Sequence, residues 1–536
     1  RGPLALVALA TADLLLLLSA DLPPPPVYTN DIVLHLSLAR GLEENHTLDF
    51  WHFTDLGYPA LRLYQPFYHL TLAVLDGATG GAVGLPWFAQ LLLVGLALAL
   101  PAAVYLGVRR WLAYEGLAAT EASWAGGVAA LLGVLSCSFS GFGYDPLQGI
   151  YARYGVVTQT WSMVFFVPAF AWTVGYLTGR VRSPWPALAL SLLVWGFSLI
   201  VGVMHALCIA LRAAVEAVVQ REPRAAIRAA GYFFGLAIVT AFLWWPLVAD
   251  SPWVNYPHPF IARWINEGFG RTAALHALFG GTLLDGASLE QRGRVPIMTL
   301  LLAIGVVAVF GRWRRQRPLA VFLLVGYVLW FSLFVGREAW GGLLYALPLL
   351  RSYQWGRMEA MLQFWATIIA ALGVVRLWPP LWTRLPTPAR GVLVATAVVA
   401  LELLARLPMS TASYDRAILD QARAGAGGRL VKDVAVRLRG ETTRTYVGGP
   451  TTWERRLVNG QILPGVALIG EGVAAAGRMY QGMNFASALV YLWDGTSPWG
   501  ASLLSVGHWF TPCDQISLLP VVPPADEVST GACLAG

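Results

Sequence analysis

The chain has 536 residues, of which 57% are hydrophobic and 12% are charged. Soluble domains carry about 25% charged residues, so this composition excludes a water-soluble enzyme, a disordered protein and a collagen-like one. The net charge of +7 comes almost entirely from arginine, and the arginines fall mostly in short loops between apolar runs. Membrane orientation explains that placement better than nucleic-acid binding does, so we expect no nucleic-acid partner.

Apolar runs of helical length recur before residue 408 and predict about 11 transmembrane helices. They exclude an outer-membrane barrel, whose strands need only ~10 alternating residues each. We place the spans at residues 3–20, 91–108, 124–138, 155–178, 185–202, 204–219, 229–248, 295–311, 318–336, 357–376 and 391–407. The run 185–219 is too long for one crossing, and we expect a hairpin that turns at Val203, Met204 and His205.

The loops between these spans alternate in charge. With residue 1 inside, the arginine-rich loops are cytoplasmic, and the long first loop 21–90 lies outside with seven acidic residues against Arg40 and Arg62. This arrangement follows the positive-inside rule. All eight histidines then fall on the outer side or at its interface, where we expect the chemistry to take place.

The character of the sequence changes near residue 408. Short β-like runs (446–447, 486–491 and 503–506) alternate there with Gly, Pro and Asn, which is typical of a small mixed domain. The last span delivers this region to the outer side. We therefore expect an all-α polytopic membrane domain over residues 1–407 and a small C-terminal extracytoplasmic α/β domain over 408–536.

The first outer loop is the most informative stretch. Asp31 stands just before a predicted helix over residues 32–40, and His35 follows one turn later, so that carboxylate and imidazole share one helix face near the membrane surface. This geometry suits abstraction of a proton from a hydroxyl. The alternative is that Asp31 only caps the helix, as Asp often does, and that His35 packs against it. The spacing alone leaves both interpretations open.

The same loop carries a wider pattern. Asp31 and His35 are followed by Gly41, Trp51, the run Gly57-Tyr58-Pro59, Tyr64 and Pro66. Together with the many spans and the outer C-terminal region, this pattern resembles the membrane glycosyltransferases of the GT-C superfamily. Bacterial multispan proteins related to 6-pyruvoyl-tetrahydropterin synthase and the YfhO-like proteins are similar in appearance. The segment 347–358 (LPLLRSYQWGRM) resembles their turn into a late span.

The resemblance implies a GT-C-like fold and transfer of a sugar from a polyprenyl-phosphate carrier to an acceptor at the outer face, with inversion. In that family the first-loop Asp is the general base, and here it would be Asp31. The implied partners are the lipid-linked donor, membrane lipid and a glycan, lipid or protein acceptor, with membrane-complex subunits as further partners. The implied location is the bacterial inner membrane and the implied product a cell-envelope glycan.

Such a displacement needs positive groups beside the departing lipid phosphate. Candidates at the outer interface are Arg153, His205, Arg351 and Arg357. Because a guanidinium can hold phosphate with two parallel donors, Arg351 and Arg357 are favoured. The alternative for Arg357 is an anchor that snorkels beside Trp355, and for His205 a packing residue.

Two more carboxylates belong to the predicted substrate-binding set with His35. These are Asp55 in the first loop and Asp145 in a later outer loop, although Asp145 precedes a proline and such pairs also start turns. The first loop has Asn30-Asp31 in place of a DxD motif, and carboxylates that hold Mg²⁺ or Mn²⁺ normally come in pairs. We therefore expect no metal site and no required cofactor, with Asp55 as the second ligand if a divalent cation does bind.

Two other functions remain open. A catalytically inactive structural or assembly subunit of a membrane complex would keep the fold without the activity. A transporter of lipid-linked glycans would place polar residues deep in several spans, and the sequence holds almost none there. We therefore favour the glycosyltransferase.

Overall fold

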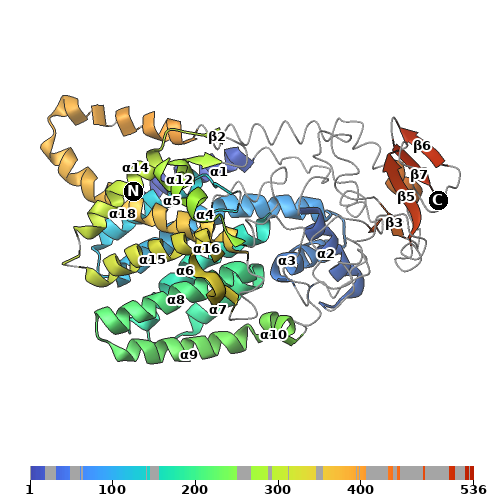
Figure 1. The fold of residues 1–536 in the computed structure, drawn as a ribbon, viewed down its shortest axis with the longest axis horizontal. Helices are drawn as coiled ribbons and strands as arrows, with labels where there is room; N and C mark the ends of the chain where they lie inside the picture. Colours follow the sequence, from blue (N-terminus) through green and yellow to red (C-terminus); the bar gives the residue numbers. More distant parts are fainter. Residues whose placement is uncertain are drawn as a thin grey trace.

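The computed structural model describes most of the helical part of the chain and a few strands near its end. The described residues are 2–18, 32–48, 61, 64–140, 142–144, 156–249, 267–287, 292–311, 313–314, 316–345, 354–390, 392–393, 395–397, 399–405, 433–438, 444–446, 475–476, 506–512, 525–529 and 532–535. Long helices run side by side through a bundle, with α2 and α3 at one end of it (Figure 1).

Apolar helices make up the bundle. They are α1 (Gly2–Leu18), α4 (Leu85–Tyr114), α5 (Ala119–Val134), α6 (Val157–Leu177), α7 (Trp185–Phe197), α8 (Leu199–Val219), α9 (Pro223–Val239), α10 (Ala241–Ala249), α14 (Ile297–Phe310), α15 (Arg317–Val335), α18 (Glu359–Arg384) and the helix Thr387–Ala405. Among the described residues, six helices are long and apolar enough to cross a membrane, and the α9–α10 pair, bent by 74°, would make a seventh. The chain is thus a multi-pass membrane protein. Each predicted span overlaps one of these helices, while the count of eleven crossings stays a prediction.

The predicted hairpin exists, but its predicted turn was wrong. The break lies at Ser198, whose backbone is extended (φ −155°, ψ 114°) and whose hydroxyl accepts a hydrogen bond from the Val201 amide at 3.4 Å. Serine at this place caps α8, because its oxygen satisfies an amide of the first helical turn. Helix α8 then continues without interruption through His205.

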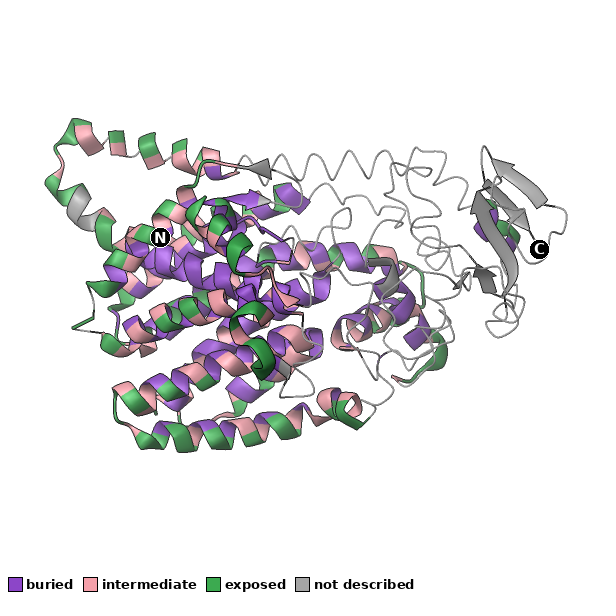
Figure 2. Cartoon of the chain, in the orientation of Figure 1, coloured by how far each residue is buried: buried purple, intermediate pink, exposed green. Residues whose placement is uncertain are grey.

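Small residues let the central helices approach closely. A Cβ added at Gly373 of α18 would lie 2.7 Å from the Cα of Gly305 in α14, and one added at Gly305 would collide with the carbonyl oxygen of Ile369. Such contacts supply van der Waals packing where lipid provides no hydrophobic drive between helices. Buried residues concentrate on the inner helices, whereas α9 is largely exposed and presents Ile227 and Phe234 outward (Figure 2).

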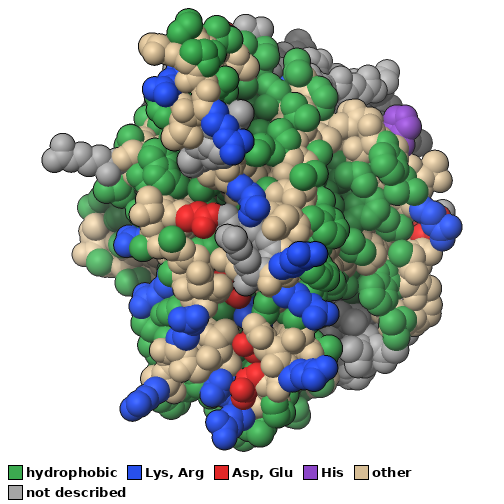
Figure 3. Space-filling view, turned by 90° about the vertical axis from the view of Figure 1, so that its left-hand side faces the viewer, with side chains coloured by type: hydrophobic (Ala, Val, Ile, Leu, Met, Phe, Trp, Pro, Cys, Tyr) green, Lys and Arg blue, Asp and Glu red, His purple; other side chains and the backbone are tan. Residues whose placement is uncertain are grey.

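The two ends of the bundle differ in charge. Exposed arginines gather on the face that Figure 3 shows, which is the left-hand end of Figure 1. The helix ends and turns at this end carry the arginines Arg109, Arg110, Arg180, Arg182, Arg221, Arg224, Arg314, Arg317 and Arg384. We call it the arginine-rich end. The loop helices α2 (Ile32–Asn45) and α3 (Phe67–Ala78) lie at the opposite end, where most described acidic residues are also found. The predicted helix after Asp31 is confirmed, since α2 starts at Ile32.

Strands from the C-terminal region form one five-stranded sheet in the order β4-β3-β5-β7-β6. Strands β3 (Arg444–Tyr446), β4 (Ala475–Ala476) and β5 (Val506–Pro512) are parallel, and β6 (Ala525–Ser529) and β7 (Ala532–Ala535) complete an antiparallel edge. Two predicted β-like runs overlap β3 and β5, and the run 486–491 lies outside the described residues. The side of the membrane on which this sheet lies stays a prediction.

The contact between α14 and α18 gives a first test. Gly305→Ala should lower the thermal stability of the purified protein by several degrees, because the added methyl group meets the α18 backbone. Gly231→Ala is the matched control, since a Cβ there meets nothing within 4 Å. Equal melting temperatures for the two variants in detergent would contradict the packing described here.

Candidate functional site

A polar network lies where α5 ends and where α6 and α18 begin, at the end of the bundle opposite the arginine-rich end. It joins the segment after α5 (135–140 and 142–144) to Gln159 of α6, Arg357 of η7 (Trp355–Met358), and Glu359 and Gln363 of α18. We call these residues the outer polar network. Its members are distant in sequence, so the bundle itself brings them together.

Glu359 anchors the network. The carboxylate is fully buried and accepts hydrogen bonds from the Phe139 amide, from the Ser140 amide at 2.9 Å and from the Ser140 hydroxyl. Several donors on one carboxylate offset much of the cost of burying its charge. The segment after α5 is thereby fixed to the first turn of α18.

Gln363, one turn further along α18, holds the same segment at two more points. Its Oε1 accepts from the Tyr144 amide at 2.7 Å, and its Nε2 donates to the Cys137 carbonyl. The Gly143 amide donates to the Ser138 hydroxyl at 2.8 Å, and a Cβ at Gly143 would lie 2.9 Å from that of Ser138 and collide with Gln363. Only glycine fits at residue 143, and the segment is tightly held.

Arg357 packs against this segment, which we call the platform. Its Nη1 donates to Oε1 of Gln159 at 3.2 Å, and its guanidinium carbon lies 4.5 Å from the ring centroid of Phe142. Gln159 is oriented by its Nε2, which donates to the carbonyls of Phe142 at 3.0 Å and Gly143 at 3.1 Å. The amide oxygen must therefore face the guanidinium. Arg357 is only partly buried, so a positive group of fixed orientation remains accessible at this end.

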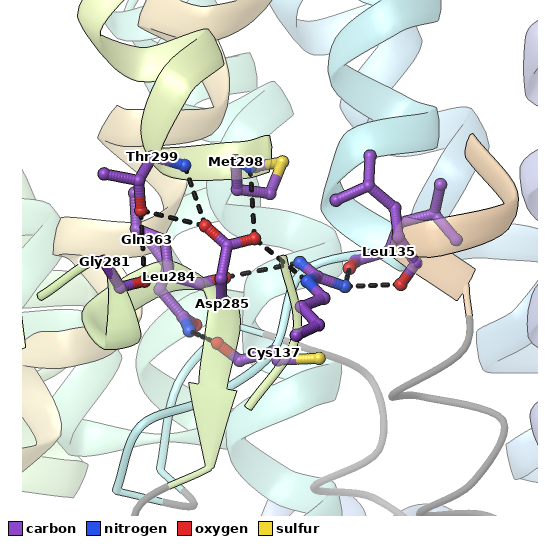
Figure 4. Close-up of polar contacts among 10 residues, drawn as sticks. Leu135, Cys137, Gly281, Leu284, Asp285, Met298, Thr299 and Gln363 are labelled. Carbon is purple, nitrogen blue, oxygen red and sulfur yellow. Dashed lines mark hydrogen bonds and ion pairs between the residues drawn. The ribbon is translucent and has the colours of Figure 1, made fainter. Parts of the chain in front are cut away.

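A second polar cluster braces the same end (Figure 4). Asp285 of α13 (Thr282–Asp285) accepts from the Met298 and Thr299 amides at 3.1 and 2.9 Å, and thus satisfies the first turn of α14. Arg294 donates to Asp285 at 2.9 Å, to the Leu135 carbonyl at 2.7 Å and to the Leu404 carbonyl. Both charged side chains are almost completely buried. The cluster clamps the ends of three helices and has a structural role.

Two buried histidines join α2 to α3. Nδ1 of His35 lies 3.0 Å from Nε2 of His69, and Nδ1 of His69 lies 3.2 Å from the Gln65 carbonyl. A carbonyl only accepts, so His69 carries its hydrogen on Nδ1, and in the neutral pair His35 donates from Nδ1. Nε2 is then the accepting nitrogen of His35, and its predicted contact with substrate stays a prediction.

The structure places three of the predicted site residues. Arg357 lies in the outer polar network, His35 is buried between α2 and α3, and His205 is buried in α8, where its ring contacts Phe166 at 5.5 Å between centroids. His205 was predicted at the tip of a hairpin, and this position was wrong. Its contact on α6 lies seven residues beyond Gln159, about 10 Å deeper along the helix. The described contacts do not bring His205 and Arg357 together.

The other predicted site residues lie outside the described residues. They are Asp31, Asp55, Asp145, Arg153 and Arg351. Within the part of the chain that the structure describes, no three His, Cys, Asp or Glu side chains are grouped so that they could hold a metal ion.

Sequence reasoning missed Gln159, Glu359, Gln363, Asp285, Arg294 and His69. One signal was available: Glu359 and Gln363 are spaced four residues apart at the start of an otherwise apolar span, so they share one helix face. The partners of that face, more than 200 residues earlier in the chain, carry no such signal.

Comparison with known proteins supports the fold. No family model matches the chain, and no curated protein matches it. Among solved structures, ArnT from Cupriavidus metallidurans bound to undecaprenyl phosphate has a TM-score of 0.57 at 14% identity, over 99% of this chain and 97% of ArnT. The archaeal oligosaccharyltransferase AglB from Archaeoglobus fulgidus, in complex with an inhibitory peptide and a dolichol-phosphate, has a TM-score of 0.55 at 13% identity, over 97% of this chain and 71% of AglB.

The chain shares the fold of ArnT and AglB. The likeness covers nearly the whole chain, and it extends to ArnT in the apo state at a TM-score of 0.55. The resemblance read from the sequence is thus confirmed at the level of the fold. The narrower likeness to the YfhO-like and pterin-synthase-related proteins stays a prediction.

The Asp285–Arg294 cluster predicts a large stability effect. Asp285→Ala should lower the free energy of unfolding by roughly 3–5 kcal/mol, because it leaves Arg294 buried without its carboxylate. Glu338→Ala is the control, since the exposed Glu338 forms an ion pair with Arg271 at 3.8 Å and accepts a hydrogen bond from the Arg271 amide at 2.7 Å, for which we expect about 1–2 kcal/mol. Denaturant titration in mixed micelles measures both, and similar losses would contradict a clamp at Asp285.

Glu43 predicts a pH dependence for the α2–α3 pair. Partial burial and the nearby carboxyl of Asp76 raise the pKa of Glu43 to about 7. Between the ordinary carboxyl pKa and about 7, the folded state holds a proton that the unfolded state has lost, so stability falls as pH rises through that window. Hydrogen exchange of α2 and α3, corrected for intrinsic rates, should show more frequent opening at pH 8 than at pH 5. Glu43→Gln should flatten this trend, and Glu44→Gln should weaken it only slightly, because the charge of Glu44 makes the smallest contribution to the raised pKa of Glu43.

Proposed function

We propose that this protein transfers a sugar from a polyprenyl-phosphate carrier to a hydroxyl acceptor, at the membrane face that carries α2 and α3. The single observation that supports it best is Arg357, held by Gln159 and Phe142 on a GT-C fold. Structures with that fold hold undecaprenyl phosphate and dolichol-phosphate. The lipid phosphate gains negative charge when its bond to the sugar breaks, and a guanidinium of fixed orientation can stabilise that charge.

The proposed reaction is a single displacement with inversion. Asp31 takes the proton from the acceptor hydroxyl as its oxygen attacks the anomeric carbon, and the bond from that carbon to the phosphate oxygen breaks. The lipid phosphate leaves with the bonding electron pair, and Arg357 neutralises its charge, with Arg351 and Arg153 as further cationic candidates. The acceptor is a glycan, a lipid or a protein.

The proposed orientation follows the charge difference between the ends. The arginine-rich end faces the cytoplasm, as the positive-inside rule expects, and the active face is extracytoplasmic. The C-terminal sheet lies on that side as well, where it contributes to acceptor binding. The location proposed is the bacterial inner membrane.

The test is transfer of labelled sugar from a polyprenyl-phosphate donor by the purified protein. Asp31→Asn should lower the rate by ~10²-fold or more, because an amide cannot take the proton. Glu44→Gln, which alters an exposed carboxylate of the same loop, should leave the rate unchanged. Gln159→Leu should lower kcat more than it raises KM for the donor, because the guanidinium that Gln159 orients then stabilises the leaving phosphate less well.

Three outcomes would contradict the proposal. Unchanged turnover in Asp31→Asn would remove Asp31 from the mechanism. A wild-type protein that transfers no sugar from any polyprenyl-phosphate donor, yet assembles with other membrane proteins, would favour the structural subunit. Movement of the lipid-linked glycan across a vesicle membrane without transfer would favour the transporter.

A further inference from the structure

A corner of the arginine-rich end gathers positive charge at the membrane surface. Two turns form it, the α6–α7 turn (178–184) and the α8–α9 turn with the start of α9 (220–228). Five arginines stand on these turns: Arg180, Arg182, Arg221, Arg224 and Arg228. We call this group the arginine corner.

Direct contacts hold the two turns together. Nη1 of Arg228 donates to the Leu177 carbonyl at 2.9 Å, which ties α9 to the last turn of α6. The same guanidinium lies 3.0 Å from the position that a Cβ would take at Gly179, where φ is +74°. Glycine tolerates that backbone and leaves room for the arginine. Because this contact joins the two turns, Arg180, Arg182, Arg221 and Arg224 extend from neighbouring turns.

The corner has little negative charge of its own. Glu222 is the single acidic residue in the two turns. Glu216, in the last turn of α8, forms an ion pair with the buried Arg212. Arg180, Arg182, Arg221 and Arg224 are exposed, and none of them forms an ion pair with a described carboxylate. The two turns thus carry five arginines and one acidic residue, so the corner attracts an anion.

Apolar side chains beside the corner set its depth in the membrane. Trp185 at the start of α7 is 68% exposed, and Ile227 on α9 is 72% exposed. Tryptophan at a helix end favours the interface between headgroups and acyl chains, and exposed aliphatic residues of a span face lipid. Arg180, Arg182, Arg221 and Arg224 precede Trp185 and Ile227 at the ends of these helices, which puts their guanidiniums at the level expected for the lipid phosphates.

We propose that the arginine corner binds the phosphate of an anionic phospholipid in the leaflet at this end of the bundle. Guanidiniums hold phosphate oxygens with paired donors, and basic pockets between transmembrane helices suit lipid headgroups. Trp185 and Ile227 border the glycerol and acyl chains of the same lipid. The proposal stands apart from the sugar-transfer site, which lies at the opposite end.

Native mass spectrometry of the full-length protein tests it, with phosphatidylglycerol and phosphatidylcholine as probes. The wild type should retain phosphatidylglycerol in preference to phosphatidylcholine. The triple variant R180Q/R182Q/R224Q should bind phosphatidylglycerol at least about tenfold more weakly. The matched control R314Q/R317Q/R384Q removes the same charge from exposed positions elsewhere at this end and should keep the wild-type affinity.

Three results would overturn the proposal. They are equal losses in both triple variants, unchanged binding in the corner variant, and displacement of the lipid by inorganic phosphate at equal concentration. The first would show diffuse attraction, and the last a site for free phosphate. All six substituted side chains are exposed, so both variants should fold, and equal melting temperatures would verify this.

Discussion

The fully buried carboxylate of Glu359 determines how the outer end of the bundle is built. Where the chain leaves a helix inside a membrane protein, its backbone amides have neither helical partners nor water. A side chain must then accept their hydrogen bonds. Glu359 supplies it to Phe139 and Ser140, and Gln363 continues the pattern on the next turn. The segment after α5 can therefore leave its helix, turn at Gly143 and place Phe142 beneath Arg357. Without that carboxylate, the amides of Phe139 and Ser140 would lose their acceptor, and only Gln363 and Gln159 would hold the segment under Arg357.

Helix α18 connects this platform to the rest of the fold. Its outer turns carry Glu359 and Gln363, and further along Gly373 meets Gly305 of α14. The outer end of α14 is fixed in turn by Asp285, and Arg294 extends that clamp to the ends of α5 and the helix Thr387–Ala405. Polar contacts thus set the helix ends, while close backbone packing sets the distance between helices deeper in the bundle.

Local patterns in the sequence were sufficient to predict the helices but not their pairing. Apolar runs located each span. The many spans, the loop pattern beginning at Asp31 and the C-terminal region together suggested the resemblance that the comparison of folds supports. The hairpin turn was misplaced because run length was used in place of the capping signal at Ser198, which carried His205 to a wrong position with it. Arg357 was predicted from its setting beside Trp355, and its role in binding stays a prediction. Gln159 and Glu359 were not found, because their roles depend on contacts with residues far away in the chain, which only the packed bundle reveals.

Among the described residues, arginines occupy at least three environments, and each implies a different role. Arg212 and Arg294 are buried against carboxylates, at 2.8 and 2.9 Å, and act as structural clamps. Arg357 and Arg110 lie over aromatic rings, which orient a guanidinium without neutralising it. The exposed arginines of the corner have neither kind of neighbour among the described residues. Because a guanidinium stays charged at every depth in the membrane, the counter-charge that the chain does not provide must come from the surroundings. At the arginine corner, we propose that the phosphate of an anionic lipid supplies it.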